Sequence, residues 1–196
     1  MGALDDAAGA NRTGDHSDEL EMGYYAVQPS RWTFQSDKIR RWVEQRLRGR
    51  VLNACAGKTK LAHDGEIVRN DLDDNRDVDV YVDVCEIADH FATGSFDTIV
   101  YDPPFSQNQA NRSYELEDGE AVVAGDDAVA KRQFDELLAP GGRVIQFGYT
   151  TTCMPMALGY ERKSAVIWNT LGRCNDYLSV IDEKPGELEA EPRWFR

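Results

Sequence analysis

The order of hydrophobic and polar positions along the chain predicts an open α/β sheet. Seven short runs are rich in β-branched and aromatic residues and are separated by polar loops, which is typical of strands. They cover residues 50–54, 65–70, 78–84, 96–102, 141–149, 164–170 and 176–184. Two segments have helical spacing instead, at 37–48 and 127–139. Helices interspersed among this many strands favour an α/β fold with one seven-stranded sheet.

Local signals predict where several of these elements begin and end. Ser36 is suited to cap the helix at 37–48, and Gly49 is suited to end it. The last two strand runs are separated by a short turn that contains Gly172, which predicts an antiparallel hairpin at one edge of an otherwise mostly parallel sheet. Ligands of open α/β sheets bind outside the carboxyl ends of the strands. The loops after residues 53, 70, 84 and 102 are therefore where a site is expected.

The two ends of the chain differ from its middle. Residues 1–22 are acidic, rich in glycine and alanine, and lack apolar periodicity, so we expect a flexible tail there. Residues 185–196 are expected to form a second loose end, which leaves 23–184 as one domain. No signal peptide is recognisable, and no apolar run approaches the roughly 18 to 20 residues that span a bilayer. These features predict a cytoplasmic protein without a membrane partner.

Cysteine usage argues against a metal centre. The four cysteines are Cys55, Cys85, Cys153 and Cys174, and none forms a CxxC pair. Only three histidines could join them as ligands. Reduced thiols without zinc are the expected state.

The charge of the chain has two interpretations. The net charge is −13, and only six of the 22 basic residues are lysine. A surface this acidic usually repels nucleic acid. However, acid-rich and lysine-poor chains also resemble the proteins of halophilic microbes, where solubility in salt sets the surface charge whatever the function. We favour the halophilic interpretation, under which local charge says more about partners than net charge.

The stretch VLNACAGKTKL at 51–61 has two competing interpretations. Its tail, Gly57-Lys58-Thr59, resembles the end of a phosphate-binding P-loop. That motif, GxxxxGK[ST], also needs a glycine five residues before Gly57, and Leu52 stands there. Leucine does not readily adopt the positive φ of such a turn, so the P-loop is disfavoured.

In the other interpretation, a strand ends at Asn53 and the small residues after it form a cofactor-binding turn. A second motif supports this interpretation. Asp102-Pro103-Pro104-Phe105 follows the strand run at 96–102, about fifty residues after the loop at Asn53. The two stretches in this order resemble the class I S-adenosylmethionine (SAM) methyltransferases, specifically the amino-methylating group that carries [D/N/S]PP[Y/F/W]. The resemblance covers residues 31–184. It implies a Rossmann-like methyltransferase sheet and SAM as the cofactor.

The resemblance also implies roles for individual residues. Asn53 falls where the family has an acid, and Lys58 and Thr59 depart from the family's Ser-Gly. Asp71 matches the acid that binds the ribose hydroxyls of SAM, and Asp83 matches the acid that contacts the adenine amino group. The implied cofactor-binding residues are Thr33, Phe34, Asn53, Ala54, Cys55, Ala56, Gly57, Asp71, Leu72, Asp83, Val84 and Asp102. Trp32 is a further candidate.

The implied catalytic residues are those of the DPPF motif. In the family, the side chain of Asp102 and the carbonyl of Pro103 would accept the two N–H bonds of an exocyclic amine, while Pro104 stiffens the loop. Phe105 would stack on the base. The long segment that follows is expected to act as a lid over the substrate, with Asn108, Arg112 and Tyr114 as binding residues.

Basic residues gather in one segment. Residues 31–50 contain seven basic and two acidic residues, against the trend of the chain. Arg40, Arg41, Arg48 and Arg50 could contact phosphates, and they could equally neutralise the acidic body of the protein. The sequence leaves both roles open.

The combined evidence predicts methyl transfer from SAM to an exocyclic amine of a nucleobase, with adenine N6 in DNA favoured over RNA. Cytosine N4, guanine N2 or adenine N6 in RNA, a protein glutamine, and a SAM-binding pseudoenzyme are the alternatives. No segment is long enough for a separate target-recognition domain. Sequence specificity is therefore expected to be modest or to depend on a partner.

The halophilic interpretation predicts salt-dependent stability. At molar salt the Debye length falls to about 3 Å, so mutual repulsion among the 35 acidic residues is screened. We expect the thermal unfolding midpoint to rise steadily as KCl increases from tenths of molar to several molar. Circular dichroism melts across a KCl series measure this, and a protein that is fully folded and active without molar salt would contradict it.

Overall fold

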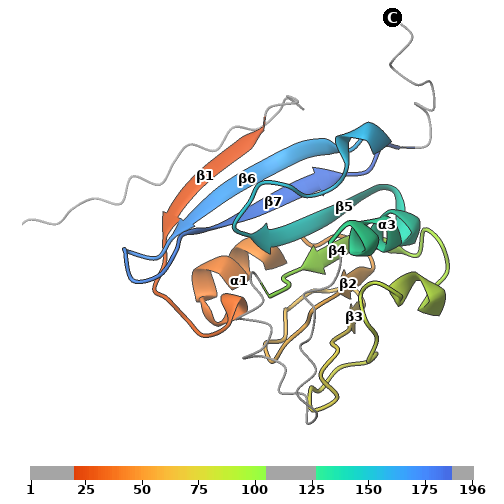
Figure 1. Ribbon diagram of the computed structural model, residues 1–196, viewed down its shortest axis with the longest axis horizontal. Coiled ribbons are helices and arrows are strands. Elements are labelled where there is room, and N and C mark those ends of the chain that lie inside the picture. Colours follow the sequence, from red (N-terminus) through yellow and green to blue (C-terminus); the bar gives the residue numbers. More distant parts are fainter. Residues whose placement is uncertain (1–19, 105–126, 187–196) are drawn as a thin grey trace, which may run out of the picture.

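The computed structural model describes residues 20–104 and 127–186, which form one seven-stranded sheet (Figure 1). Its spatial order is β1-β6-β7-β5-β4-β2-β3. The strands are β1 (Glu21–Ala26), β2 (Val51–Asn53), β3 (Ile67–Arg69), β4 (Phe96–Tyr101), β5 (Leu138–Gly148), β6 (Glu161–Asn169) and β7 (Tyr177–Glu183). Strand β7 is antiparallel to both of its neighbours, and the other pairings are parallel. The predicted α/β architecture, a mostly parallel sheet with an antiparallel hairpin, is confirmed.

Two helices cover opposite faces of this sheet. Helix α1 (Asp37–Glu44) packs on the cluster that contains Val51, Val100 and Ile145. Helix α3 (Asp127–Leu137) packs on the cluster that contains their chain neighbours Leu52, Ile99 and Val144. Successive strand residues point to opposite faces, so each central strand is buried on both sides. Short 3-10 turns complete the chain at Thr33–Gln35 (η1), Ile87–His90 (η2) and Met156–Leu158 (η3).

One predicted strand does not form. Residues 78–84 contribute only a single bridge, between Asn70 and Val80. Backbone hydrogen bonds of Asp79 and Val80 with Arg69 and Asp71 hold part of this segment, and side chains hold the rest. Asp79 accepts a hydrogen bond from the backbone N–H of Arg69 at 2.8 Å, and the amide of Asn70 bonds both backbone groups of Val82. The alternation of valine and aspartate therefore reflects carboxylates that bind backbone N–H groups, not the alternating faces of a strand.

Strand β1 was not predicted, and it begins within the segment expected to be a tail. It pairs in parallel with β6 and takes the edge of the sheet, outside the β6–β7 hairpin (Figure 1). Most of its residues are exposed, so its sequence shows no alternation of apolar and polar positions. Tyr25 stacks on Trp168 with ring centroids 5.4 Å apart, and Glu21 pairs with Arg46 at 2.5 Å. These contacts attach β1 to the body.

The first helix is shorter than predicted. It ends at Glu44 rather than at 48, and the chain then turns through Gln45 and Arg46. Ser36 occupies the N-cap position, but its side chain makes no capping hydrogen bond. In the described part of the chain, no helix is long and apolar enough to cross a membrane.

Candidate functional site

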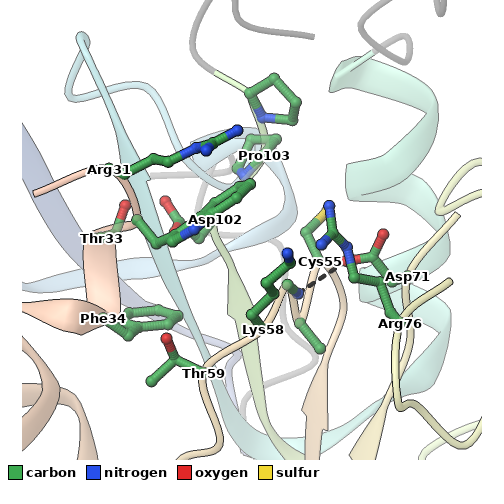
Figure 2. A pocket seen from close by; sticks show the side chains of 14 residues that line it. Arg31, Thr33, Phe34, Cys55, Lys58, Thr59, Asp71, Arg76, Asp102 and Pro103 are labelled. Atoms are coloured by element: carbon green, nitrogen blue, oxygen red, sulfur yellow. Dashed lines mark hydrogen bonds between the residues drawn. The ribbon is translucent and has the colours of Figure 1, made fainter. Parts of the chain in front are cut away.

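A cleft lies at the carboxyl ends of β2, β3 and β4. Asn53, the last residue of β2, is paired with Arg69 on one side and Val100 on the other, so the loops that leave the three strands emerge together. The segment before α1 forms another wall (Figure 2). The lining residues are Arg31, Trp32, Thr33, Phe34, Cys55, Ala56, Gly57, Lys58, Thr59, Asp71, Arg76, Asp102, Pro103 and Pro104. The loops after residues 53, 70 and 102 line the cleft, as expected, and the loop after residue 84 does not.

The loop after β2 turns at Gly57, which has a φ of +54°. Its N–H donates to a carboxylate oxygen of Asp71 at 2.8 Å, and its carbonyl accepts from the guanidinium of Arg69 at 3.0 Å. A Cβ added to Gly57 would meet no atom within 4 Å, so open space adjoins this turn. Residues 54–66 form no helix, which separates this loop from a P-loop, where a helix N-terminus faces the phosphates. The turn is rigid and open on one side.

Asp71 has a structural role in addition to its place in the cleft. Its side chain is almost fully buried, with 3 % of the residue exposed. One oxygen accepts the Gly57 N–H, and the other accepts the N–H of Asp73 at 3.0 Å. An ionised carboxylate offers about four acceptor positions. Asp71 therefore fixes the loop and keeps capacity for two further hydrogen bonds from a ligand.

Asp102 follows β4 and reaches the cleft beside Thr33 (Figure 2). Desolvation raises the pKa of the Asp102 carboxyl to about 7, and a hydrogen bond with Thr33 opposes this rise. Asp102 as a residue has intermediate exposure and lines the cleft, while protein surrounds its carboxyl group. At neutral pH it therefore lies near the midpoint of its titration, and a nearby positive charge would favour its ionised form.

The wall before α1 is held by aromatic and cationic contacts. The guanidinium groups of Arg31 and Arg76 each lie 5.3 Å from the centre of the Trp32 ring. Arg76 is also paired with Asp73 at 2.9 Å. Phe34 is buried against Phe147 in an edge-to-face contact. Trp32 thus joins the segment before α1 to the loop after β3.

Cys55 lines the cleft as a neutral thiol. Burial raises its pKa well above the ordinary value, and the charges of Asp71, Asp102 and Asp83 raise it further. These three carboxylates are therefore all near the thiol of Cys55. Within residues 20–104 and 127–186, no group of three or more side chains could hold a metal ion.

Of the fourteen assigned residues that the structure describes, nine line the cleft. Those that line the cleft are Thr33, Phe34, Cys55, Ala56, Gly57, Asp71, Asp102, Pro103 and Pro104. Those assigned to the substrate side, Phe105, Asn108, Arg112 and Tyr114, lie outside the described residues.

Five other assigned residues do not line the cleft. Asn53 and Ala54 are fully buried at the base of the loop, and neither polar atom of the Asn53 amide has a hydrogen-bond partner among the described residues. Leu72 points outward and is 41 % exposed. Asp83 accepts the N–H of Cys85 at 2.8 Å, and Val84 packs against the core on the α3 side. Of these five, Ala54 and Val84 pack in the core and Asp83 forms a turn, while Leu72 is exposed.

Other lining residues were not assigned from the sequence. Arg31 and Arg76 line the cleft and both pack on Trp32, and no local pattern in the sequence marks them. Lys58 and Thr59 were noted only as departures from the family pattern, although both line the cleft. Tyr177, at the start of β7, lies close to Asp102. Burial raises the pKa of the Tyr177 hydroxyl, and the charge of Asp102 raises it further.

Three of the four arginines considered for phosphate contacts are paired within the protein. Arg40 binds Asp37 at 2.5 Å, Arg48 binds Glu183 at 3.5 Å, and Arg50 binds Glu66 at 2.9 Å. For these three the structure favours neutralisation of the acidic body. No ion pair of Arg41 is formed among the described residues.

No protein family's sequence profile matches this chain, and no curated protein matches it. Its fold is similar to that of TrmN from Thermus thermophilus, with a TM-score of 0.53 and 16 % identity over 76 % of this chain and 49 % of that one. The chain therefore spans about half the length of TrmN. The [4+2]-cyclase SpnF gives a TM-score of 0.52 and 13 % identity over 76 % of this chain and 81 % of that one. YhhF from Escherichia coli, named as a methyltransferase, gives a TM-score of 0.50 and 9 % identity over 83 % of this chain and 90 % of that one.

These likenesses identify the fold as the Rossmann-like fold of methyltransferases. The presence of a cyclase among them shows that the fold alone does not determine the reaction. The function has to be argued from the residues of the cleft.

Replacing Gly57 with alanine should strain the loop without a steric clash. A positive φ costs alanine about 1 kcal/mol, which for a chain of this length lowers the unfolding midpoint by about 2–4 °C. Gly141→Ala is the matched control, because Gly141 also has a positive φ and open space but lies at the opposite end of β5 from the cleft. Differential scanning calorimetry should find similar losses in both variants. A loss well above this range in Gly57→Ala alone would show that the space beside Gly57 is not open.

The raised pKa of Asp102 predicts a pH-dependent cost in stability. The folded protein holds a proton on this carboxyl up to about pH 7, whereas an unfolded aspartate releases it near 3.8. Stability is therefore lost as the pH rises through this interval. Asp102→Asn removes the titration, so its unfolding midpoint should match that of the wild type near pH 4 and exceed it at pH 8. Equal midpoints at both pH values would contradict the raised pKa.

Proposed function

We propose that this protein is a SAM-dependent methyltransferase that modifies an exocyclic amine of a nucleobase, with adenine N6 in DNA as the favoured target. The observation that carries the proposal is the arrangement of Asp102-Pro103-Pro104 in the same cleft as the Gly57 turn and Asp71. The motif and the loop are about fifty residues apart in the sequence. Their meeting in one cleft is what the resemblance to amino-methyltransferases requires.

The cleft fits the proposed cofactor. The open space beside Gly57 allows a ligand to approach the backbone closely, which a Cβ would obstruct. Asp71 retains acceptor positions suited to two ribose hydroxyls. Cys55 stays neutral, so it adds no charge where an uncharged part of a ligand would lie.

The residues at the end of β4 suit the chemistry of an amine. The lone pair of an exocyclic amine is delocalised into the base, so the amine must be turned to make it available. The Asp102 carboxylate and the Pro103 carbonyl are acceptors for its two N–H bonds, and holding both would point the lone pair away from the ring. The bound cofactor supplies the electrophilic methyl group. After transfer the nitrogen carries a positive charge, and its extra proton passes to Asp102 or to water.

Rigidity of this acceptor pair is part of the proposal. Pro103 and Pro104 have fixed φ angles, and neither has an N–H that could compete for the acceptors. Thr33 holds the carboxyl of Asp102 from the opposite wall. A pKa near 7 allows Asp102 to be ionised when a cationic ligand is bound and to take up a proton afterwards.

The test is nucleoside mass spectrometry with isotope-labelled SAM in molar KCl, using unmethylated DNA and, separately, total RNA. We expect label in deoxyadenosine, and we expect Asp102→Ala to abolish it while the protein still binds SAM. Asp64→Ala, a change at an exposed aspartate of the loop before β3, is the control and should keep full activity.

The other outcomes each identify an alternative. Label in deoxycytidine would move the target to cytosine N4, and label only in RNA would assign the enzyme to guanine or adenine in RNA. Binding of SAM without label in either nucleic acid would favour a protein target or a pseudoenzyme. Full activity of Asp102→Ala would refute the role given to Asp102.

A further inference from the structure

Lys58 is a cation without an anionic partner in the part of this acidic protein that the structure describes. It lines the cleft, and within the described residues it forms no hydrogen bond or ion pair. Lys60, two residues later, is paired with Asp77 at 2.6 Å. In a chain with 35 acidic and 22 basic residues, carboxylates are the more abundant partner. An unpaired ammonium in a cleft is therefore suited to an anion that arrives with a ligand.

The backbone near Lys58 lacks the usual source of positive charge. The N-terminus of a helix carries a partial positive charge and free N–H groups, which make it an anion site. Residues 54–66 contain no helix, so this loop brings no helix N-terminus to the cleft. The Gly57 N–H is also occupied by Asp71. Within this loop, the positive charge that reaches the cleft comes from the Lys58 side chain, while Arg31 and Arg76 line the cleft from other segments and pack on Trp32.

The charges of the proposed cofactor select which of its groups can approach Lys58. SAM carries a sulfonium and an ammonium, which are positive, and a single negative group, its methionine carboxylate. Lys58 would repel the first two. In Figure 2 the Lys58 side chain rises into the cleft, in view between Asp102 on one side and Asp71 on the other. The two acids are suited to the cationic and hydroxyl-bearing parts, which leaves the carboxylate for Lys58.

We infer that the Lys58 ammonium binds the methionine carboxylate of SAM and supplies the charge that a helix N-terminus would otherwise provide. This inference rests on the proposed function. The rigid turn at Gly57 fixes the backbone from which Lys58 extends, and the Thr59 side chain lies next to it in the cleft wall. The departure of Gly57-Lys58-Thr59 from the family's loop is then an adaptation to a loop without a helix.

Isothermal titration calorimetry of the full chain tests the assignment with two ligands, SAM and decarboxylated SAM. They differ only in the carboxylate. Lys58→Gln should weaken SAM binding by about 10-fold, the size of one lost charge-assisted contact. The same change should leave the affinity for decarboxylated SAM unchanged or increase it, because a repulsive charge is removed. Titrations use the lowest KCl concentration at which circular dichroism shows a folded protein, because salt screens the contact.

Lys60→Gln is the matched control, since it removes a lysine of the same loop that is paired with Asp77 outside the cleft wall. It should change neither affinity. Equal weakening of both ligands by Lys58→Gln would overturn the inference, and so would no weakening of SAM. ATP is a third ligand, and ATP binding that depends on Lys58 while SAM binding does not would assign this lysine to phosphate instead. Absence of SAM binding by the wild type is a different result, which would refute the proposed cofactor itself.

Discussion

The parallel pairing of β2 between β3 and β4 is the constraint on which the rest of the structure depends. Strand β2 has three residues, all fully buried, and its register sets Asn53 opposite both Arg69 and Val100. Apolar clusters on both faces hold this register, because a shift by one residue would exchange the faces of every side chain. The Gly57 turn, Asp71 and Asp102 meet only as a result of this alignment. The cleft is thus a product of the core, not of the loops alone.

Residues at the end of β3 hold the loop that follows β2. Three consecutive residues reach across to it. Arg69 binds the carbonyl of Gly57, the amide of Asn70 binds the carbonyl of Ala54 at 3.0 Å, and Asp71 binds the Gly57 N–H. The loop is therefore fixed by side chains of the neighbouring strand. This arrangement keeps the loop short and ordered, but it depends on polar groups whose loss would leave buried partners unsatisfied.

The parts of this fold that could be predicted are those encoded by local sequence. The buried central strands are dense in β-branched and aromatic residues, and β4 and β5 were located within a few residues. The segment 78–84 misled the prediction, because its aspartates alternate with valines but bind backbone groups. Strand β1 left no pattern, since an exposed edge strand buries neither face. The motif at Asp102 and the loop at Gly57 were recognisable in the sequence because short turns demand particular residues.

The wall of the site could not be read from the sequence in the same way. Arg31 and Arg76 lie 45 positions apart and meet on Trp32 only in the folded chain. The charge of Asp102 is tuned by burial and by Thr33, and neither can be inferred from composition. Ion pairing of Arg48 likewise depends on an acid from a distant strand, Glu183.

The placement of β1 at the sheet edge has a consequence for how the cleft opens. The chain runs from β1 through residues 27–30 directly into the cleft wall, so the edge strand and the wall form one continuous segment. Edge elements with few buried apolar contacts have low local unfolding free energies. Fraying of β1 would loosen Arg31, Trp32 and Thr33 together. Hydrogen exchange along β1 would then report on the access of ligands to a site several strands away in the sheet.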